Sequence, residues 1–461
     1  MLSELFSRFI QESATTVMAR AVLERMLPPE QLDAWFERTA ERQYTRELLF
    51  SSVFEMMLDV VCGIRASVHA AYQALAHTLP VSVVSVYHKL NGLEPSTAAA
   101  LVRYVASQAS ALIRELGGER PVLLPGYVVR ILDGNCLAAS EHRLKELRAL
   151  RGAPLPGKSL VVYDPSLDVV VDVLPCEDGY TQERALLADV LQRVSPGELW
   201  VGDRNFCVRA FLLGLRAREA FFLIREHEQF RFRPRGPMHE VGASETGTVA
   251  EQAIEVLDDA GERVVLRRIR VRLKTPTRAG ETVIYVLTNL PAEVDALTVA
   301  GLYRKRWTLE TAFQALEAHF HSEINTLGYP KAALFGFCIA LVAYNVWAVV
   351  QAALRRVHGV EKVEQEVSGY HLAQEMSATY RGMMIALPPS EWAVFQTLSL
   401  AAMAACLLDW AQHVRLSAVR KHRRGPKKPA SKRPYDPQHP HVSTARLIAK
   451  RKKKSKAGVS P

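Results

Sequence analysis

Short segments rich in β-branched residues lie between positions 121 and 225, and they constrain the fold of this chain more than any other feature. Three of them follow one another directly, and helical patterns then alternate with two more. The predicted strands are Val128–Leu132, Ser159–Tyr163, Val169–Leu174, Leu199–Asp203 and Phe221–Arg225, and the predicted helices are Arg184–Val194 and Val208–Leu215. This order predicts an α/β fold in which helices cover a mixed sheet.

Two aspartates stand where predicted strands of this sheet end. Asp133 follows Val128–Leu132 and precedes Gly134, and Asp203 closes the strand that begins at Leu199. Open α/β sheets bind their ligands at the carboxyl ends of strands. Both aspartates are therefore candidate site residues.

The stretch Leu302–Phe320 carries apolar residues at three- and four-residue steps, which predicts a helix. Tyr303, Arg306 and Glu310 lie beside its apolar stripe, within about 60° of one another. They form either an ordinary solvated flank with an Arg306–Glu310 pair one turn apart, or the edge of a site. The spacing alone does not decide between these alternatives.

Residues 1–120 are predicted to be helical. Within them, a short helix ends at Asn91-Gly92 and carries Ser85, Tyr87, His88 and Lys89. It is either the recognition helix of a helix-turn-helix or a plain packing helix.

Residues 226–290 form a β-rich insertion whose central strand, Val264–Lys274, alternates strictly between apolar and cationic residues. The cationic side consists of Arg268, Arg270, Arg272 and Lys274. These side chains either keep a sheet edge soluble or contact the phosphates of a nucleic acid.

The segment Ala332–Leu354 is nearly all apolar and approaches the length of a membrane span. Because Asn345 and Gln351 interrupt it and a soluble domain precedes it, we expect a buried helix and no membrane partner.

Charge is concentrated at the C-terminus. Residues 415–461 hold sixteen of the 58 Lys and Arg residues but one of the 48 Asp and Glu residues. This stretch is expected to be a disordered tail, and its basic run, Lys452 to Lys454, suggests a polyanion partner. The cysteines are scattered and no signal-peptide pattern begins the chain, so we expect a reducing, cytoplasmic location.

Two other chemistries are disfavoured. Residues Gly152–Ser159 match the phosphate-binding string G-x-x-x-x-G-K-[ST], but a β-branched strand follows where that motif requires a helix, and two prolines remove N–H donors. Cys136 and Cys207 follow the two aspartates without a supporting histidine, so they are expected to be small buried hydrophobic residues.

A carboxylate cluster is the favoured chemistry. Asp133, Asp203 and Glu310 would supply oxygen ligands alone, which suit Mg²⁺ or Mn²⁺. Two such ions about 3.5–4 Å apart can activate water and stabilise a leaving oxygen in phosphodiester cleavage. Tyr303 and Arg306 would then hold a non-bridging phosphate oxygen.

In these residues the chain resembles the bacterial insertion-sequence transposases of the DDE type that carry a Tyr-x2-Arg-x3-Glu-x6-Lys signature. Tyr303, Arg306 and Glu310 match its spacing, and Ile131–Gly134 and Val201–Phe206 resemble the two aspartate blocks of that family. The family's lysine falls at Glu317, which is acidic. This departure leaves a catalytically inactive, transposase-derived DNA-binding protein as the alternative to an active enzyme.

The resemblance implies a ribonuclease H-like core, interrupted by the β-rich insertion and preceded by a helical DNA-binding region. It implies a transposase that uses two Mg²⁺ ions, binds terminal inverted repeats as a homodimer, cleaves at the element ends and transfers the 3′ ends into target DNA. Such a protein would be cytoplasmic and nucleoid-associated. The expected division is 1–120 DNA-binding, 121–225 first part of the core, 226–290 insertion, 291–360 second part of the core with the glutamate helix, 361–413 C-terminal helices, and 414–461 basic tail.

Overall fold

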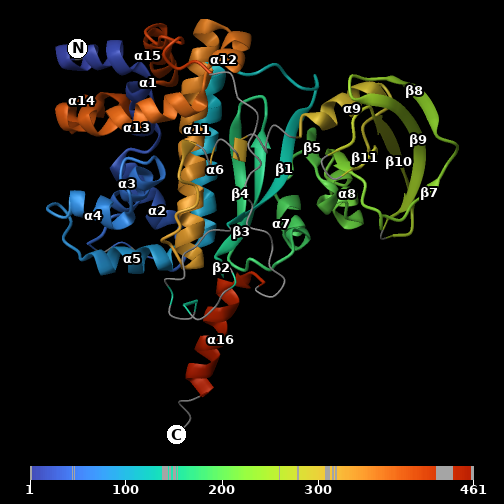
Figure 1. Ribbon diagram of the computed structural model, residues 1–461, viewed down its shortest axis with the longest axis horizontal. Helices are drawn as coiled ribbons and strands as arrows, with labels where there is room; N and C mark the ends of the chain where they lie inside the picture. The colour runs from blue at the N-terminus through green and yellow to red at the C-terminus, as the bar shows by residue number, and fades with distance from the viewer. Residues whose placement is uncertain are drawn as a thin grey trace.

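The structure is a computed structural model that describes residues 3–43, 45, 47–137, 144, 147–148, 152, 154–258, 260–277, 280–306, 312–313, 316, 319–421 and 440–457. Figure 1 shows a layer of helices beside a long sheet. The helices that precede the sheet are α1 (Glu4–Met26), α2 (Pro29–Thr39), α3 (Phe50–Val61), α4 (Val68–Leu75), α5 (Val83–Gly92) and α6 (Pro95–Leu116).

The sheet runs in the order β4-β3-β1-β5-β6-β11-β10-β9-β7, with β8 paired to β9. Its strands are β1 (Val128–Leu137), β3 (Gly157–Asp164), β4 (Val169–Cys176), β5 (Glu198–Gly202), β6 (Phe221–Arg225), β7 (Arg233–Pro234), β8 (His239–Ala243), β9 (Gly247–Leu257), β10 (Arg263–Leu273) and β11 (Val283–Thr288). Strand β1 pairs antiparallel with β3 and parallel with β5, and β5 pairs parallel with β6. The predicted mixed sheet flanked by helices is confirmed.

The β-rich segment after β6 continues the same sheet, because β11 pairs antiparallel with β6. Two polar side chains strengthen this junction. The Asn289 side chain accepts from the Phe222 amide at 2.8 Å and donates to the Ala220 carbonyl at 3.0 Å, and the Thr288 hydroxyl donates to the Phe222 carbonyl at 2.6 Å. These hydrogen bonds therefore fix β6 beside β11, the strand through which the β-rich segment joins the rest of the sheet.

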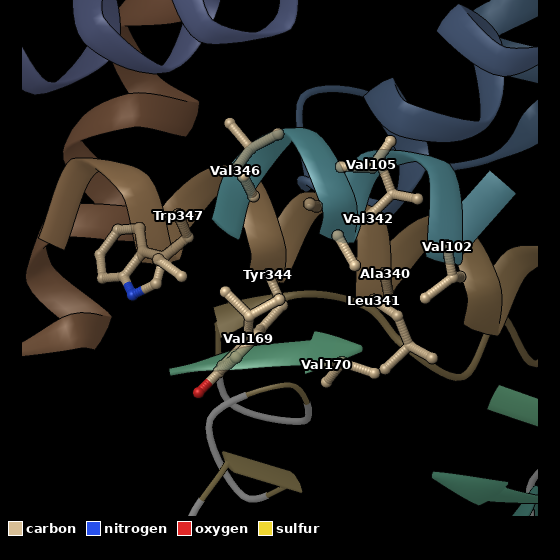
Figure 2. Close-up of a cluster of buried hydrophobic side chains, with 14 of the residues drawn as sticks. Val102, Val105, Val169, Val170, Ala340, Leu341, Val342, Tyr344, Val346 and Trp347 are labelled. Atoms are coloured by element: carbon tan, nitrogen blue, oxygen red, sulfur yellow. The ribbon is translucent and has the colours of Figure 1, made fainter. Parts of the chain in front are cut away.

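Apolar side chains alternate between the two faces of the sheet, as the strand period of two requires. Ile131 of β1 joins the core shared with α6 and α11 (Pro330–His358), whereas its neighbour Leu132 joins the core under α7 (Leu187–Leu191) and α8 (Arg209–Arg216). Figure 2 shows the first of these cores, where valines of α6 and β4 meet the apolar face of α11.

Helix α11 is long and apolar enough to span a membrane, but 94% of its most apolar part is buried in the fold. Its polar interruption has a structural purpose. The Asn345 amide accepts from the Val170 N–H and donates to the Val170 carbonyl, both at 2.9 Å, and so joins the helix to β4. The prediction of a buried helix over Ala332–Leu354 is confirmed.

The helix predicted over Leu302–Phe320 is confirmed in part: the described residues Ala312, Phe313, Leu316 and His319 are helical, whereas Lys305 and Arg306 form a turn. Helix α9 (Ala296–Arg304) ends before Arg306, because its last turn tightens into i→i+3 hydrogen bonds from Lys305 to Leu302 and from Arg306 to Tyr303. Glu310 and Glu317 lie outside the described residues.

The C-terminal helices are α12 (Val360–Glu366), α13 (Gly369–Ala386), α14 (Pro389–Trp392) and α15 (Leu400–Gln412). Beyond them, part of the expected disordered tail is ordered: β12 (Val442–Ser443) leads into α16 (Thr444–Ala457). Alanine, lysine, arginine and leucine dominate α16 and favour helix, which the charge-based expectation of disorder did not weigh.

Helix α5, the candidate recognition helix, has one packed and one exposed face. Val86 and Leu90 are buried, whereas Ser85 and His88 face solvent. The ammonium of Lys89 lies 4.6 Å from the centre of the Phe36 ring, which draws this side chain toward the helical layer. A role for α5 in reading bases stays a prediction, with Ser85 and His88 as its exposed polar groups.

His319 gives the fold a predicted pH dependence. Burial lowers the pKa of its imidazole to about 4, and its Nδ1 has no hydrogen-bond partner among the described residues. An unfolded histidine titrates near 6.5, so the unfolded state gains a proton first as the pH falls. The contribution of the neutral imidazole to the free energy of unfolding is therefore complete above pH 6.5 and decreases as the pH falls toward 4. We expect the urea midpoint of the wild type to fall over this range more than that of His319→Gln; equal declines would contradict the assignment.

Candidate active site

The two predicted aspartates are neighbours at one edge of the sheet. The parallel pairing of β1 with β5 ends at Leu132 opposite Gly202, so Asp133 and Asp203 are the next residue on each strand. Neighbouring strands lie about 4.8 Å apart, and in-register residues share a face. The two carboxylates therefore emerge side by side, on the face of the sheet that also carries Ile131.

Asp133 does not end its strand, contrary to the sequence prediction. Strand β1 continues to Leu137 because β3 pairs with it throughout, including Asp133 opposite Val161. Only β5, the parallel partner of β1, ends at this level, and this leaves the β5 side of Asp133 open. Its Oδ1 accepts from the Gly134 N–H at 2.9 Å, which fixes the carboxylate at the strand edge.

Asp203 immediately follows β5, as predicted, and caps the short 3₁₀ turn Arg204–Phe206 by accepting from the Arg204 N–H at 2.6 Å. The side chain is half-buried. Both aspartates are thus held through Oδ1 by the amide of the following residue.

Arg306 and Tyr303 reach the same edge from α9 and the turn after it. The guanidinium of Arg306 donates to Oδ2 of Asp133 at 3.1 Å, and its side chain is only 9% exposed. Tyr303 is buried, and burial raises the pKa of its phenol well above the ordinary value, with the charge of Asp203 contributing in the same direction. Tyr303 therefore stays a neutral hydrogen-bond donor near Asp203.

Arg225 completes a row of three charged groups, and sequence reasoning missed it. Gly202 of β5 lies opposite Ile224 of β6, so Arg225 is the next residue on the third parallel strand, level with Asp203. The predicted strand Phe221–Arg225 is correct, and Arg225 could have been recognised as a site residue from its place at the end of that strand. The last residue of a parallel strand reaches the edge at which Asp203 stands.

Glu281, in the turn between β10 and β11, holds Arg225 in place. It accepts a hydrogen bond from Arg225 and a second, at 3.2 Å, from the Thr277 hydroxyl. The hydrogen bond from Arg225 is the main reason that the pKa of Glu281 falls below its usual range. The β-rich segment thus contributes a carboxylate that orients an arginine of the candidate site.

The oxygen ligands at this edge suit a hard divalent cation. Two in-register carboxylates on adjacent strands offer oxygen donors without sulfur or nitrogen, which fits Mg²⁺ or Mn²⁺. Among the residues that the structure describes, no group of three His, Cys, Asp or Glu side chains could hold a metal ion. The third expected ligand, Glu310, lies outside those residues.

The predicted cationic face of the insertion is largely paired with acids. Arg268 donates to both carboxylate oxygens of Glu226 and lies over the Tyr285 ring, 3.8 Å from its centre. Arg270 lies 3.7 Å from Glu240, whereas Arg272 is exposed. A DNA role for Arg268, Arg270 and Arg272 stays a prediction, and the Glu226 pairing makes Arg268 the least available of the three.

The string Gly152–Ser159 lies in a context unlike that of a nucleotide-binding loop. It leads into β2 (Pro154–Leu155) and then β3, a strand in which Ser159 is fully buried. Since no helix begins after Lys158, backbone N–H groups are not gathered around a phosphate there. The sequence argument against an ATPase agrees with this geometry.

Comparison with known proteins identifies the class. Residues 125–346 match the family described as "Transposase DDE domain". This region holds both aspartates, Arg225, Glu281, Tyr303 and Arg306. The matched region, just under half of the chain, therefore supports an insertion-sequence transposase of the DDE type.

One relative is y4zB of Sinorhizobium fredii, whose name provisionally assigns it as a transposase; it is 24% identical over 206 residues, which are 43% of this chain. The matched segment spans 54%, about half, of that relative's own length. A solved structure, the piggyBac transposase synaptic complex with hairpin DNA, aligns with a TM-score of 0.41 and 10% identity, covering 94% of this chain and 90% of that one.

Proposed function

We propose that this transposase cleaves phosphodiester bonds at the ends of a mobile element in a metal-dependent reaction and transfers the freed 3′ ends into target DNA. The observation that carries the proposal is the meeting of Asp133, Asp203 and Arg306 at one sheet edge, with Arg306 donating to Asp133 at 3.1 Å. These residues come from three distant parts of the chain and match the three blocks of the resemblance.

Asp133, Asp203 and Glu310 would hold the metal. Divalent cations at such a site supply an activated water molecule and neutralise charge on the leaving oxygen when they are bound. Arg306 is nearly buried, so its bond to a phosphate oxygen would be little weakened by solvent. Tyr303 would donate a neutral hydrogen bond, and Arg225, oriented by Glu281, would offer a second cationic donor beside Asp203.

The order β4-β3-β1-β5-β6 supports the further proposal that these strands form a ribonuclease H-like core, with three antiparallel strands followed by two parallel ones. Helices α1 to α6 would then form the DNA-binding region and β7 to β11 the insertion. Terminal inverted repeats and target DNA are the proposed partners, and pairing two ends favours a homodimer on DNA.

Metal dependence gives the direct test. The chain is incubated with a DNA fragment carrying the ends of its own element, in Mg²⁺, in Mn²⁺ and in EDTA. We expect cuts at the element boundary in either metal and none in EDTA. Binding without cutting in both metals would contradict the proposal and favour the inactive DNA-binding alternative, for which Glu317→Lys is the next variant.

A further inference from the structure

The C-terminal segment returns to the core and docks on the glycine-rich string that resembles a nucleotide loop. Strand β12 pairs in parallel with β2, Val442 with Pro154 and Ser443 with Leu155. A Cβ on Gly152 would lie 2.1 Å from the carbonyl oxygen of Pro440, a distance that no side chain tolerates. A glycine at position 152 is therefore explained without a nucleotide, because only a residue without a side chain lets the backbone at Pro440 come this close.

A polar clamp fixes the start of α16. Asp178 accepts from the Ser443 hydroxyl at 2.7 Å and from Nε of Arg446 at 2.7 Å. Tyr180 donates its hydroxyl to the His441 carbonyl, and its ring centre lies 5.1 Å from the Arg446 guanidinium. Burial opposes ionisation of Asp178, but these hydrogen bonds prevail and lower its pKa. Asp178 thus stays ionised and holds both Ser443 and Arg446.

This clamp lies at the same sheet edge as the candidate active site. Glu183, three residues after Tyr180, accepts at 3.3 Å from the side chain of Asn205, which lies in the turn that Asp203 caps. Its other oxygen lies 2.1 Å from where a Cβ on Gly134 would stand, so Glu183 also lies against the neighbour of Asp133. The clamp and the aspartates are connected through one short segment.

From the clamp, α16 projects away from the body of the molecule, as Figure 1 shows. Seven of its fourteen residues are Lys or Arg, and none is Asp or Glu. Lys450, Arg451 and Lys453 are exposed. Like charges one turn apart destabilise a helix, so a bound polyanion that neutralises them would stabilise α16. The helix is about 21 Å long, which is about half a turn of duplex DNA.

We propose that Gly152, Pro154 and Leu155 with Asp178 and Tyr180 hold α16 as a basic arm, which binds the phosphate backbone of duplex DNA beside the bond to be cut. The position relative to the cut rests on the proposed function, whereas DNA binding by the arm does not. A nucleic-acid backbone is the partner chosen because α16 exposes Arg446, Lys450, Arg451 and Lys453 and its sequence contains no acid.

The first experiment removes charge. The variant Lys450→Gln/Arg451→Gln/Lys453→Gln and the wild type are titrated onto a fluorescein-labelled duplex at increasing KCl. Each lost phosphate contact reduces the salt slope by about 0.9, so we expect a slope lower by about 2.7 and affinity at least about tenfold weaker at low salt. The matched control, Arg216→Gln/Lys362→Gln/Arg381→Gln, removes three exposed cations of α8, α12 and α13, outside the proposed DNA-binding region, and should leave both values unchanged. An unchanged slope in the arm variant would overturn the proposal.

The second experiment tests the clamp. Photoreactive benzoylphenylalanine replaces Lys453, and cross-links to a duplex bearing the element end are mapped with and without Asp178→Ala. We expect cross-links within a narrow span near the cut in the wild-type background, and a broad distribution with an unchanged salt slope once the clamp is lost. Identical maps would show that the clamp does not position the arm. Since binding and cross-linking need no catalysis, a protein that cross-links but never cuts contradicts only the proposed function.

Discussion

Asp203→Ala is expected to abolish cleavage at the element ends while leaving DNA binding within about twofold of wild type. The residue stands level with Asp133 and Arg225 where the parallel pairing of β1, β5 and β6 ends, and a metal ion and the scissile phosphate would meet there. Loss of a metal-holding carboxylate removes several kcal/mol of transition-state stabilisation. We expect a rate at least about 10³-fold lower, which corresponds to on the order of 4 kcal/mol.

The control for this variant is Asp189→Ala, which removes an exposed carboxylate from α7, under the opposite face of the sheet. It should cleave at the wild-type rate. Asp203 also caps a turn through the Arg204 amide, so the melting temperature is measured for both variants to separate folding from chemistry. Cleavage by a folded Asp203→Ala protein at more than a tenth of the wild-type rate would remove Asp203 from the metal site.

The sequence predicted the part of this site that depends on local pattern. β-branched runs located β1, β5 and β6, and the residues after two of these runs were the aspartates now found side by side. It could not predict that β1 continues past Asp133, because that depends on pairing with β3, which is formed by residues about thirty positions away. Periodicity likewise extended the helix of Tyr303 through Arg306, whereas α9 ends at Arg304 and the Arg306 side chain donates to a carboxylate 173 positions earlier.

Arg225 and Glu281 show a different limit. Their pairing joins the end of a core strand to a turn of the β-rich segment, and neither residue belongs to a motif. Charge counting failed at α16 for a related reason. A basic tail favours disorder by itself, but Asp178, Tyr180 and β2 supply partners that composition cannot reveal. Long-range partners decided the continuation of β1, the pairing of Arg225 with Glu281 and the docking of β12, and the local sequence pattern contains none of these contacts.

Asp168→Ala should destabilise the fold more than any substitution at the active edge. This aspartate is 4% exposed and forms a buried network: it pairs with Arg120 at 2.9 Å and with the fully buried Arg355 at 3.5 Å, and it accepts from the hydroxyls of Tyr163 and Tyr344. Figure 2 shows the Tyr344 hydroxyl directed away from the apolar cluster to which its ring belongs.

Removal of Asp168 leaves the Arg355 guanidinium buried with less neutralising charge, and breaking such a pair costs about 3–5 kcal/mol. We expect the free energy of unfolding, measured by urea titration with circular dichroism, to fall by this amount. Asp168→Asn is the matched control, since asparagine keeps the shape and tolerates the φ of 62° that Asp168 adopts. It loses the charge but retains an oxygen acceptor, so its loss should be smaller. Equal stability of the alanine variant and wild type would mean that Glu364, which lies 3.4 Å from Arg355, balances that charge without Asp168.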